Sequence, residues 1–381
     1  MIKEFLTSKP LYYNEIDYTR MPRVYQSIKS NFSDSKIIHL IGTNAKGTTG
    51  RFLASALNST GYKVGHYTSP HILEFNERIW LNGKDVSYST LDEAHEKLQD
   101  ILTKEDSDSL SYFEYTTFLA MLVFNGCDYI VLEAGLGGEH DATAVFAKKL
   151  TLVTPIDLDH EAFLGSNIED IATTKLNAIS KNAIIAFQKF EQVNDIAKEI
   201  ASKSNARIYD TNELLDQQDI EKMEIISKKL DLAEYLKDNL RLSISALKFL
   251  ECEYEIDDFI GAKLFGRLSK INNNIYVDVG HNPLAARSIE KALTGGKFIL
   301  IYNSYKDKDY KEILSILKPL IIHVEIIDIE DERIESINLL QTTLNDLKIK
   351  YEIHKEISED SKYLVFGSFS VVEAFLREYY E

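Results

Sequence analysis

Short apolar runs alternate with amphipathic segments along the first half of the chain. Continuous apolar runs are typical of strands buried on both faces of a parallel sheet. They occur at 36–41, 129–133, 150–154, 183–187 and 207–209. Segments 116–124 and 168–179 carry helical periodicity, as crossovers between parallel strands require. The pattern predicts an α/β domain with a mostly parallel sheet, in which the charged segment 211–237 is ambiguous.

A second series of the same kind starts near residue 261. Apolar runs at 274–279, 297–301, 321–326 and 363–366 alternate with helical patterns at 284–293, 309–317, 334–347 and 370–379. Between 253 and 266 the chain has several acidic residues and two glycines but no strong periodicity. We therefore expect an N-terminal domain over 1–260 and a smaller, Rossmann-like α/β domain over 261–381.

The segment 42–49, GTNAKGTT, directly follows the first predicted strand. Helical spacing of apolar residues resumes at Phe52, and Gly61 stands where a helix C-cap is expected. A tight turn between a strand and a helix N-terminus presents backbone N–H groups to phosphate, and Lys46 adds a positive charge. The spacing differs from the usual phosphate-loop pattern, so an ordinary strand-to-helix turn is the alternative.

Composition and charge narrow the classes of partner. The chain has 381 residues, 44% hydrophobic and 27% charged, which is ordinary for a folded protein of two domains. Its formal net charge of −17 opposes binding to nucleic acid or to an anionic membrane surface. Anionic substrates then require local positive features such as the loop at Lys46, or bound metal ions.

The two cysteines, Cys127 and Cys252, lie far apart in the sequence. They fit core thiols in a reducing compartment and do not form a disulfide framework or a cysteine-based zinc site. The N-terminus lacks a basic segment followed by an apolar stretch, and no apolar run is long enough to cross a membrane. A cytoplasmic location and a monomer are the default expectations.

Several further motifs follow the loop in a characteristic order. They are TSPH at 68–71, NER at 76–78, SYFE at 111–114, LEAGLGG at 132–138, DVGHNP at 278–283, KDKDY at 306–310 and FGS at 366–368. From about residue 36 onward the chain resembles the folylpolyglutamate synthase and dihydrofolate synthase family, a branch of the ATP-dependent Mur-type amide ligases. The resemblance implies a phosphate-loop ATPase-like first domain and a glutamate-binding second domain.

The resemblance implies an ATP and magnesium site in the first domain. The ATP phosphates are expected at Thr43, Asn44, Ala45 and Lys46, and magnesium at Ser69, Glu133 and His160. Hydroxyl and carboxylate oxygens at strand ends beside a phosphate loop suit magnesium. Taken singly, the three metal ligands have simpler interpretations as a turn residue, a strand-end charge and a hydrogen-bonded loop histidine.

Lys175 matches the family position at which a lysine is carbamylated, and its new carboxylate then helps to bind a second magnesium ion. Carbamylation requires a neutral amine, so the resemblance implies a buried Lys175 with a lowered pKa. From the sequence alone, Lys175 is a solvated helix lysine.

For the second domain, the resemblance implies that Arg267 and Asp278 contact ATP. Asn239, near the end of the first domain, is a weaker match for the same role, and His281 and Ser368 are expected to face the incoming glutamate. The sequence around Asn282 and Pro283 also fits a plain structural turn that leads into a helix.

The folate-type acceptor is expected against two segments of the first domain. Those segments contribute Ser111, Tyr112, Phe113, Glu114, His140, Asp141 and Ala142, which match the dihydropteroate-contacting positions of the family. Aromatic rings with a carboxylate suit stacking on and hydrogen bonding to a flat heterocycle. Tyr112 and Phe113 fit ordinary core positions at a helix start equally well.

Two residues depart from the family pattern. Ala45 replaces the usual loop glycine, and its Cβ is tolerated only where the backbone does not need a positive φ or a very close phosphate approach. Glu139 stands where an arginine is usual. The first departure bears on ATP affinity and the second on the choice of acceptor.

The predicted activity is ATP-dependent ligation of L-glutamate to dihydropteroate, to folates, or to both, through an acyl phosphate. Lys46, Lys175 and His281 are the expected catalytic residues. No enzyme nucleophile is needed, and the sequence has no convincing nucleophilic triad. A single-activity folylpolyglutamate synthase, a Mur-type cell-wall ligase and a degenerate ligase that binds nucleotide without catalysis are the alternatives.

Overall fold

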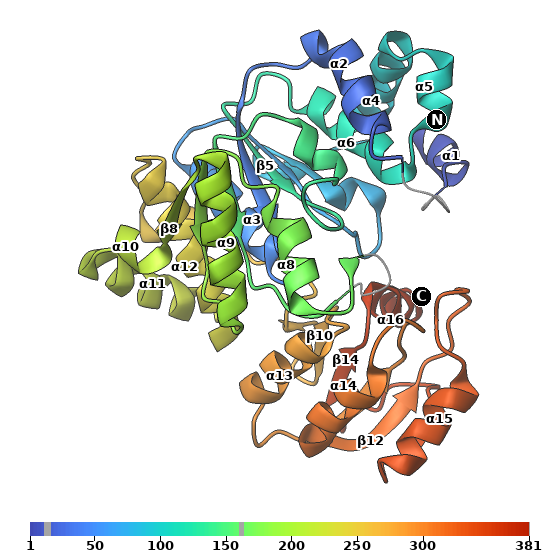
Figure 1. Cartoon of the computed structure of the whole chain (residues 1–381). Coiled ribbons are helices and arrows are strands. Elements are labelled where there is room, and N and C mark those ends of the chain that lie inside the picture. The colour runs from blue at the N-terminus through green and yellow to red at the C-terminus, as the bar shows by residue number, and fades with distance from the viewer. Residues whose placement is uncertain (11–16, 160–163, 381) are drawn as a thin grey trace. The chain divides into compact units, whose positions relative to one another are not determined.

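The computed structural model describes residues 1–10, 17–159 and 164–380. It divides into two compact units: unit 1 is Met1–Leu232 with Leu236–Ala262, and unit 2 is Ala233–Tyr235 with Lys263–Glu381. Each unit is built around one mostly parallel sheet with helices on both faces (Figure 1). The predicted α/β class is therefore confirmed.

Among the described residues, eight strands form the sheet of unit 1. In spatial order they are β4 (Lys84–Asp85), β3 (Ile79–Leu81), β2 (Val64–Tyr67), β5 (Tyr129–Glu133), β1 (Lys36–Ile41), β6 (Leu150–Val153), β7 (Asn182–Ile185) and β8 (Arg207–Asp210). The first two pair antiparallel, and the other six run parallel. The central strand β1 is buried on both faces from Ile37 to Ile41, and all of these residues are apolar except His39.

Two helical layers cover this sheet. Ile38 and Leu40 of β1 pack with α3 (Lys46–Ser59), α11 (Gln217–Lys229) and α12 (Glu234–Phe249). On the other face lie α1 (Ile2–Thr7), α2 (Arg20–Ile28), α4 (Tyr88–Ile101), α6 (Tyr112–Val123), α8 (Ile168–Leu176) and α9 (Glu191–Ser204). The short helices α5 (Lys104–Ser109) and α10 (Thr211–Leu214) complete the described helices of this unit.

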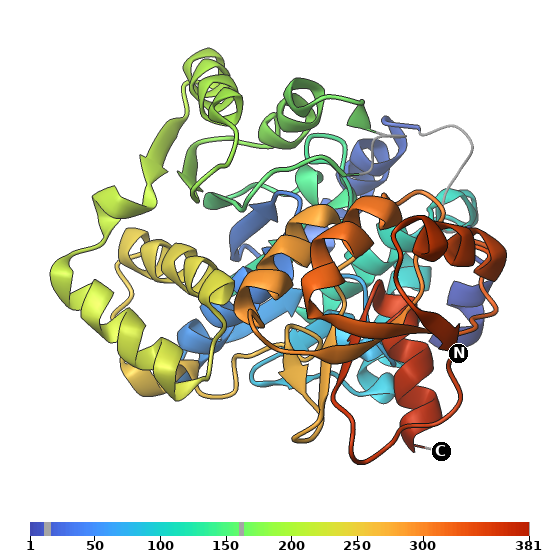
Figure 2. The same ribbon diagram turned by 90° about the horizontal axis from the view of Figure 1, so that it is seen from below.

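In the described part of unit 2, six strands form a second sheet. Their order is β13 (Tyr351–Ile353), β12 (Ile321–Ile326), β11 (Phe298–Tyr302), β14 (Tyr363–Phe366), β10 (Ile275–Asp278) and β9 (Ser269–Lys270), with only β9 antiparallel. Helices α13 (Pro283–Ala292), α14 (Tyr310–Leu317) and α15 (Ile337–Asp346) pack on one face. Figure 2 shows α16 (Phe369–Tyr380, red) on the opposite side of the strands.

Most of the predicted strands and helices are confirmed to within a few residues, because most of the apolar runs are strands buried on both faces; the exceptions are β8 and the first half of β12, which are partly exposed. The ambiguous segment 211–237 is helical. Its central helix, α11, buries Met223 and Ile226 and is started by a capping box in which Asp216 and Asp219 accept each other's backbone N–H. The sequence analysis did not predict β2, whose sequence VGHY contains a glycine and a histidine.

No helix in the described ranges is both long enough and apolar enough to cross a membrane. Cys127 and Cys252 are both buried free thiols, as predicted.

Glycine is required in β2 because Gly65 lies directly against a ring of the core. A Cβ at Gly65 would lie 2.4 Å from the Cγ and Cδ1 atoms of Phe124. Gly65→Ala should therefore lower the free energy of unfolding by about 1–3 kcal/mol, the usual range for overpacking. The effect is measured by urea denaturation monitored by circular dichroism.

A double-mutant cycle supplies the control. In a Phe124→Leu background, the cost of Gly65→Ala should be smaller, because the colliding ring is gone. An equal cost in both backgrounds would show that the packing of Gly65 on Phe124 is not the cause.

Candidate active site

The loop between β1 and α3 is supported by the segment that follows β6. The N–H groups of Thr43 and Asn44 donate to the carbonyl oxygen of Pro155 at 2.9 and 3.4 Å, and the Thr43 hydroxyl donates to the carbonyl of Asp157 at 3.0 Å. The helix that follows begins at Lys46, and its first N–H groups have no partner within the helix. The loop therefore presents the positive end of α3 at the carboxyl edge of the sheet, where open α/β sheets bind ligands.

Lys46 lies along this loop rather than pointing into solvent. Its Nζ donates to the carbonyl oxygens of Gly42 and Thr43 at 3.2 and 3.3 Å and lies 4.0 Å from Oε1 of Glu133. Glu133 is the last residue of β5 and is 5% exposed. Its Oε2 accepts from the Ser69 N–H at 3.1 Å and from the Thr68 hydroxyl. One oxygen of Glu133 thus holds the segment after β2, and the other faces Lys46.

Lys175, on α8, is directed at the same loop. Its side chain is buried, and Nζ donates to the carbonyl oxygen of Gly42 at 3.1 Å. Burial, together with the nearby charge of Lys46, lowers the pKa of Lys175 to about 7. A substantial fraction of Lys175 is therefore the neutral amine near pH 7, which is the form that reacts with CO2.

Two glycines of the segment 132–138 allow close packing around this loop. A Cβ at Gly138 would lie 2.3 Å from the carbonyl oxygen of Lys175, and a Cβ at Gly135 would lie 2.7 Å from the ring of Phe113. The segment therefore touches both the backbone of Lys175 and the predicted acceptor-binding residue Phe113.

The predicted acceptor-binding residues Ser111 and Glu114 form a capping box at the start of α6. The Ser111 hydroxyl accepts from the Glu114 N–H at 3.3 Å, and Glu114 Oε2 accepts from the Ser111 N–H at 2.8 Å. Glu114 also pairs with Arg20 of α2, whose Nε and terminal nitrogen lie 3.0 and 2.9 Å from Oε2. Both partners are largely buried, so this ion pair is shielded from solvent.

The rings of Tyr112 and Phe113, beside this capping box, contact other aromatic side chains. Phe113 stacks on Tyr67 at a centroid distance of 5.7 Å, and Tyr112 contacts the edge of Phe75 at 6.2 Å. The guanidinium of Arg78 lies 5.3 Å from the Tyr112 ring centre. Arg78 belongs to the NER segment, so this contact joins two of the motifs on which the resemblance was based.

Asp141 is bonded to groups of its own segment. Its carboxylate accepts from the N–H groups of Gly135, Leu136 and Thr143, each at 2.9 Å, and from the Thr143 hydroxyl, and it caps the short 3-10 helix that starts at the buried Ala142. Burial nevertheless raises the pKa of Asp141. His140, in contrast, is partly exposed. Its ring contacts that of Tyr18 in a tilted arrangement, at a centroid distance of 4.2 Å, and its Nε2 lies 3.1 Å from Oε1 of Glu139.

Asn239 is buried on the face of α12 that packs against α3. One turn further along, the Ser243 hydroxyl donates to the carbonyl oxygen of Thr49 at 2.8 Å. Thr49 lies in the first turn of α3, so this face of α12 adjoins the helix end that follows the loop after β1.

In unit 2, Asp278 is a buried carboxylate at the end of β10. It accepts from the N–H groups of Leu268 and Gly280 at 2.8 and 2.7 Å and from the Tyr235 hydroxyl at 3.1 Å. Burial raises the pKa of Asp278, while the charge of Arg267 opposes that rise. The Arg267 guanidinium lies 5.4 Å from the ring centre of Phe369.

The two residues predicted to face glutamate differ in exposure. His281 is partly exposed and lies with Nδ1 3.2 Å from the carbonyl oxygen of Val279. Ser368 is fully buried, and its hydroxyl accepts from the Val371 N–H at the start of α16. Asn282 caps α13, with Pro283 at the first helical position, so the structural interpretation of these two residues is confirmed.

Comparison with known proteins bears on the family. No protein-family model matches the chain. The chain is 30% identical over 368 residues to the dihydrofolate synthase/folylpolyglutamate synthase of Buchnera aphidicola subsp. Schizaphis graminum, covering 88% of this chain and 86% of that protein. The Escherichia coli protein of the same name is 31% identical over 303 residues, covering 75% and 71% of the two chains. The chain belongs to the dihydrofolate synthase/folylpolyglutamate synthase family.

Solved structures of this family are also similar. The Helicobacter pylori folylpolyglutamate synthetase has a TM-score of 0.81 at 38% identity, covering 100% of this chain and 98% of that one. The E. coli FolC complex with DHPP and ADP has a TM-score of 0.81 at 25% identity, covering 99% and 96%. The resemblance inferred from the motifs is therefore confirmed at the level of the family and the fold.

The structure brings Thr43, Asn44, Lys46, Glu133 and Lys175 together at one loop. The predicted ligand His160 lies outside the described residues. Sequence reasoning missed the residues that support this set, including Thr68, Arg20, Asp157 and Tyr235. These supporting contacts join segments far apart in the chain, so no local pattern marks them. Only Thr68, as the first residue of TSPH, stood within a recognised motif.

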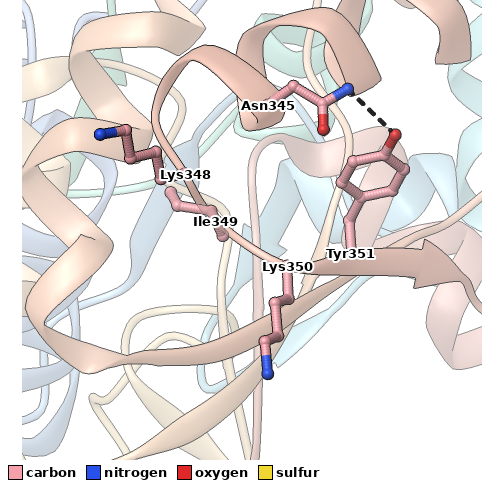
Figure 3. A pocket seen from close by; sticks show the side chains of 5 residues that line it. All are labelled: Asn345, Lys348, Ile349, Lys350 and Tyr351. Atoms are coloured by element: carbon pink, nitrogen blue, oxygen red, sulfur yellow. Dashed lines mark hydrogen bonds between the residues drawn. The ribbon is translucent and has the colours of Figure 1, made fainter.

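Unit 2 has a surface hollow that does not include any of the predicted site residues. It is lined by Asn345, Lys348, Ile349, Lys350 and Tyr351 (Figure 3). These residues precede or begin β13, whereas Asp278 ends the parallel strand β10. The hollow therefore lies at the opposite edge of the sheet from Asp278.

Ala45 adopts the left-handed conformation that the family's glycine would take freely, with φ 75° and ψ −8°. A non-glycine residue pays about 1–2 kcal/mol there, partly offset by the greater freedom of glycine in the unfolded chain. We expect Ala45→Gly to raise the free energy of unfolding by about 1 kcal/mol in urea denaturation. Ala201→Gly in the helix α9 should instead lower it by about 1 kcal/mol. Equal losses for both variants would refute strain at Ala45.

Proposed function

We propose that this protein is an ATP-dependent ligase that joins L-glutamate to dihydropteroate and to folates through an acyl phosphate. The observation that carries the proposal is the convergence of Lys46, Lys175 and Glu133 on the loop after β1. Membership of the dihydrofolate synthase/folylpolyglutamate synthase family supports it. So does the likeness to the E. coli FolC structure with DHPP and ADP.

The loop and its lysine bind the ATP phosphates. The N-terminus of α3 offers unpaired N–H groups and the positive end of the helix dipole. The Lys46 ammonium moves from the loop carbonyls onto phosphate oxygens and neutralises charge that develops during phosphoryl transfer. Asn239 in unit 1 and Arg267 and Asp278 in unit 2 are the further ATP-contacting residues of this proposal.

The residues beside the loop fit magnesium. Glu133 places a carboxylate oxygen 4.0 Å from Lys46 Nζ, and Ser69 follows in the segment that the other oxygen holds. With His160, Ser69 and Glu133 would hold one ion, and a carbamylated Lys175 would help to hold a second. Hard oxygen donors beside phosphates are the usual magnesium environment. Bound magnesium would supply electrostatic stabilisation of the phosphates.

The reaction proceeds in two balanced steps. The acceptor carboxylate attacks the γ-phosphorus of ATP, which gives an acyl phosphate and releases ADP. The amine of glutamate then attacks the acyl carbon, inorganic phosphate leaves, and the nitrogen loses a proton as the amide forms. His281, which is partly exposed in the DVGHNP turn, is placed on the glutamate side. No enzyme nucleophile takes part.

The acceptor lies against the segments 111–114 and 140–142. Tyr112, Phe113 and His140 supply rings for a flat heterocycle, while Ser111, Glu114, Asp141 and Ala142 set the backbone that carries those rings. Ser368 is buried, so it supports the turn before α16 rather than offering its hydroxyl directly.

The deciding assay compares two acceptors. Phosphate release by the purified full chain is measured with MgATP, L-glutamate and either dihydropteroate or a tetrahydrofolate, and products are identified by mass. Release with both acceptors supports a bifunctional enzyme, and release with one assigns a single activity. Nucleotide binding without release from either acceptor would refute the ligase proposal in favour of a degenerate ligase. Release with a UDP-muramoyl acceptor alone would assign a cell-wall ligase instead.

A matched pair of lysine variants tests the phosphate role in the same assay. Lys46→Met should lower kcat by about 100-fold or more, because it removes a cation that stabilises the transition state. Lys198→Met changes an exposed lysine of α9 and should leave kcat unchanged. Equal rates for the two variants would show that Lys46 does not act on the phosphates.

The proposed carbamylation of Lys175 can be tested separately through its pH dependence. The neutral amine fraction rises as the pH increases through about 7, the value to which burial lowers the pKa of Lys175. With 13C-labelled bicarbonate, a carbamate carbon signal should therefore be stronger at pH 8 than at pH 6 in NMR spectra. Lys175→Arg should abolish that signal because a guanidinium stays charged. A signal that survives the substitution would place the carbamate elsewhere.

A further inference from the structure

A mixed histidine and glutamate cluster lies on the outer strands of unit 2. His323 and Glu325 alternate with Val324 on β12, so both side chains point to the same face of the sheet. Glu325 is directly opposite Glu352 in the parallel register of β12 with β13. The three side chains therefore share one face of two adjacent strands.

Figure 3 fixes which face this is. The ring of Tyr351 points toward α15, where its hydroxyl accepts from the side chain of Asn345 at 3.2 Å. Because successive residues of a strand point to opposite faces, Glu352 points away from α15. Phe375 of α16 lies on that other face, with its ring centre 6.3 Å from that of His354.

The cluster has the separations of a coordination sphere. Nε2 of His323 lies 3.0 Å from Glu352 Oε1 and 3.4 Å from Glu325 Oε1, and the three ligand atoms all lie within 4.8 Å of one another. Ligands at zinc distances in tetrahedral geometry are about 3.4 Å apart. The arrangement thus needs little movement to surround a cation.

One atom of the cluster makes no hydrogen bond. Nε2 of His323 is excluded from solvent and has no hydrogen bond among the described residues, although it lies close to two carboxylates. A buried polar nitrogen without a hydrogen bond costs free energy. A cation between the imidazole and the two carboxylates would give all three a common partner.

A second histidine orients one of the ligands. His354 Nδ1 lies 2.6 Å from Oε2 of Glu325, so the oxygen that faces away from His323 is also engaged. Nε2 of His354 lies 3.9 Å from a carboxylate oxygen of Glu378 on α16. Such outer contacts are typical of ligating carboxylates in metal sites. Glu352, whose side chain is 63% exposed, leaves the site open to solvent.

We propose that His323, Glu325 and Glu352 form a zinc site that clamps the edge strand β13 to β12. Imidazole nitrogen with carboxylate oxygens suits zinc among the common divalent cations. The cluster lies within the strands of unit 2. The residues proposed for glutamate ligation lie instead in unit 1 or near the carboxyl ends of the parallel strands of unit 2. The site is therefore distinct from the magnesium site, and its metal serves structure rather than glutamate ligation.

The test is zinc binding by the full chain in the presence of excess magnesium, measured by isothermal titration. The same samples are loaded with Co2+ for visible spectra, which report tetrahedral nitrogen and oxygen ligands. His323→Ala and Glu352→Gln should each weaken zinc binding by about 10-fold or more and abolish the cobalt bands. Glu356→Gln, a matched change at an exposed glutamate just beyond β13, should alter neither.

Zinc at a hundredfold excess over its dissociation constant should also raise the unfolding temperature by about 5 °C in the unmodified chain and in Glu356→Gln only. If His323→Ala fails to fold, the exposed Glu352→Gln decides the question. Zinc binding that is unchanged in Glu352→Gln would overturn the proposal. So would a failure to detect zinc binding in the presence of excess magnesium, which would leave the cluster as side chains without a metal.

Discussion

A single backbone carbonyl holds the two lysines on which the site in unit 1 depends. The oxygen of Gly42 accepts from both Lys46 and Lys175, at 3.2 and 3.1 Å. Burial lowers the pKa of Lys175, and repulsion by the nearby ammonium group of Lys46 lowers it further. The arrangement favours either a neutral Lys175 or an anion at the loop. A phosphate and a carbamate each supply such an anion, so the same geometry suits both the proposed nucleotide binding and the proposed modification.

Buried carboxylates hold the loops around both sets of candidate residues. Asp141 in unit 1 and Asp278 in unit 2 each accept several backbone N–H groups from a tight turn beside a strand end. Burial raises the pKa of both, and the hydrogen bonds work against that rise. Carboxylates of this kind fix the backbone that carries neighbouring side chains. Their conspicuous place in the motifs therefore reflects positioning at least as much as direct contact with ligands.

The fold was largely predictable because parallel strands covered on both faces are continuous apolar runs. The run at 36–41 is β1 to the residue, and 321–326 is β12. The hydrophobic pattern did not predict the secondary structure of two segments, in which packing matters more than composition. Strand β2 contains Gly65, which makes room for Phe124, and a buried histidine, His66, so it lacks an apolar run. The charged segment 211–237 folds as helix because one narrow apolar stripe and a capping box are enough when the helix packs on a domain.

The sequence by itself determined the fold class and the family, and it marked the loop after β1 as the candidate phosphate site, because these depend on local periodicity and on the order of motifs along the chain. Tertiary structure alone decided which side chains meet. It turned Lys175 from a solvated helix lysine into a buried amine at Gly42, and it paired Arg20 with Glu114 across 94 positions of sequence. It also set His323 beside Glu352, since the register between two strands is fixed only when the sheet assembles. Burial and strand register arise from distant segments, and no local pattern of residues encodes them.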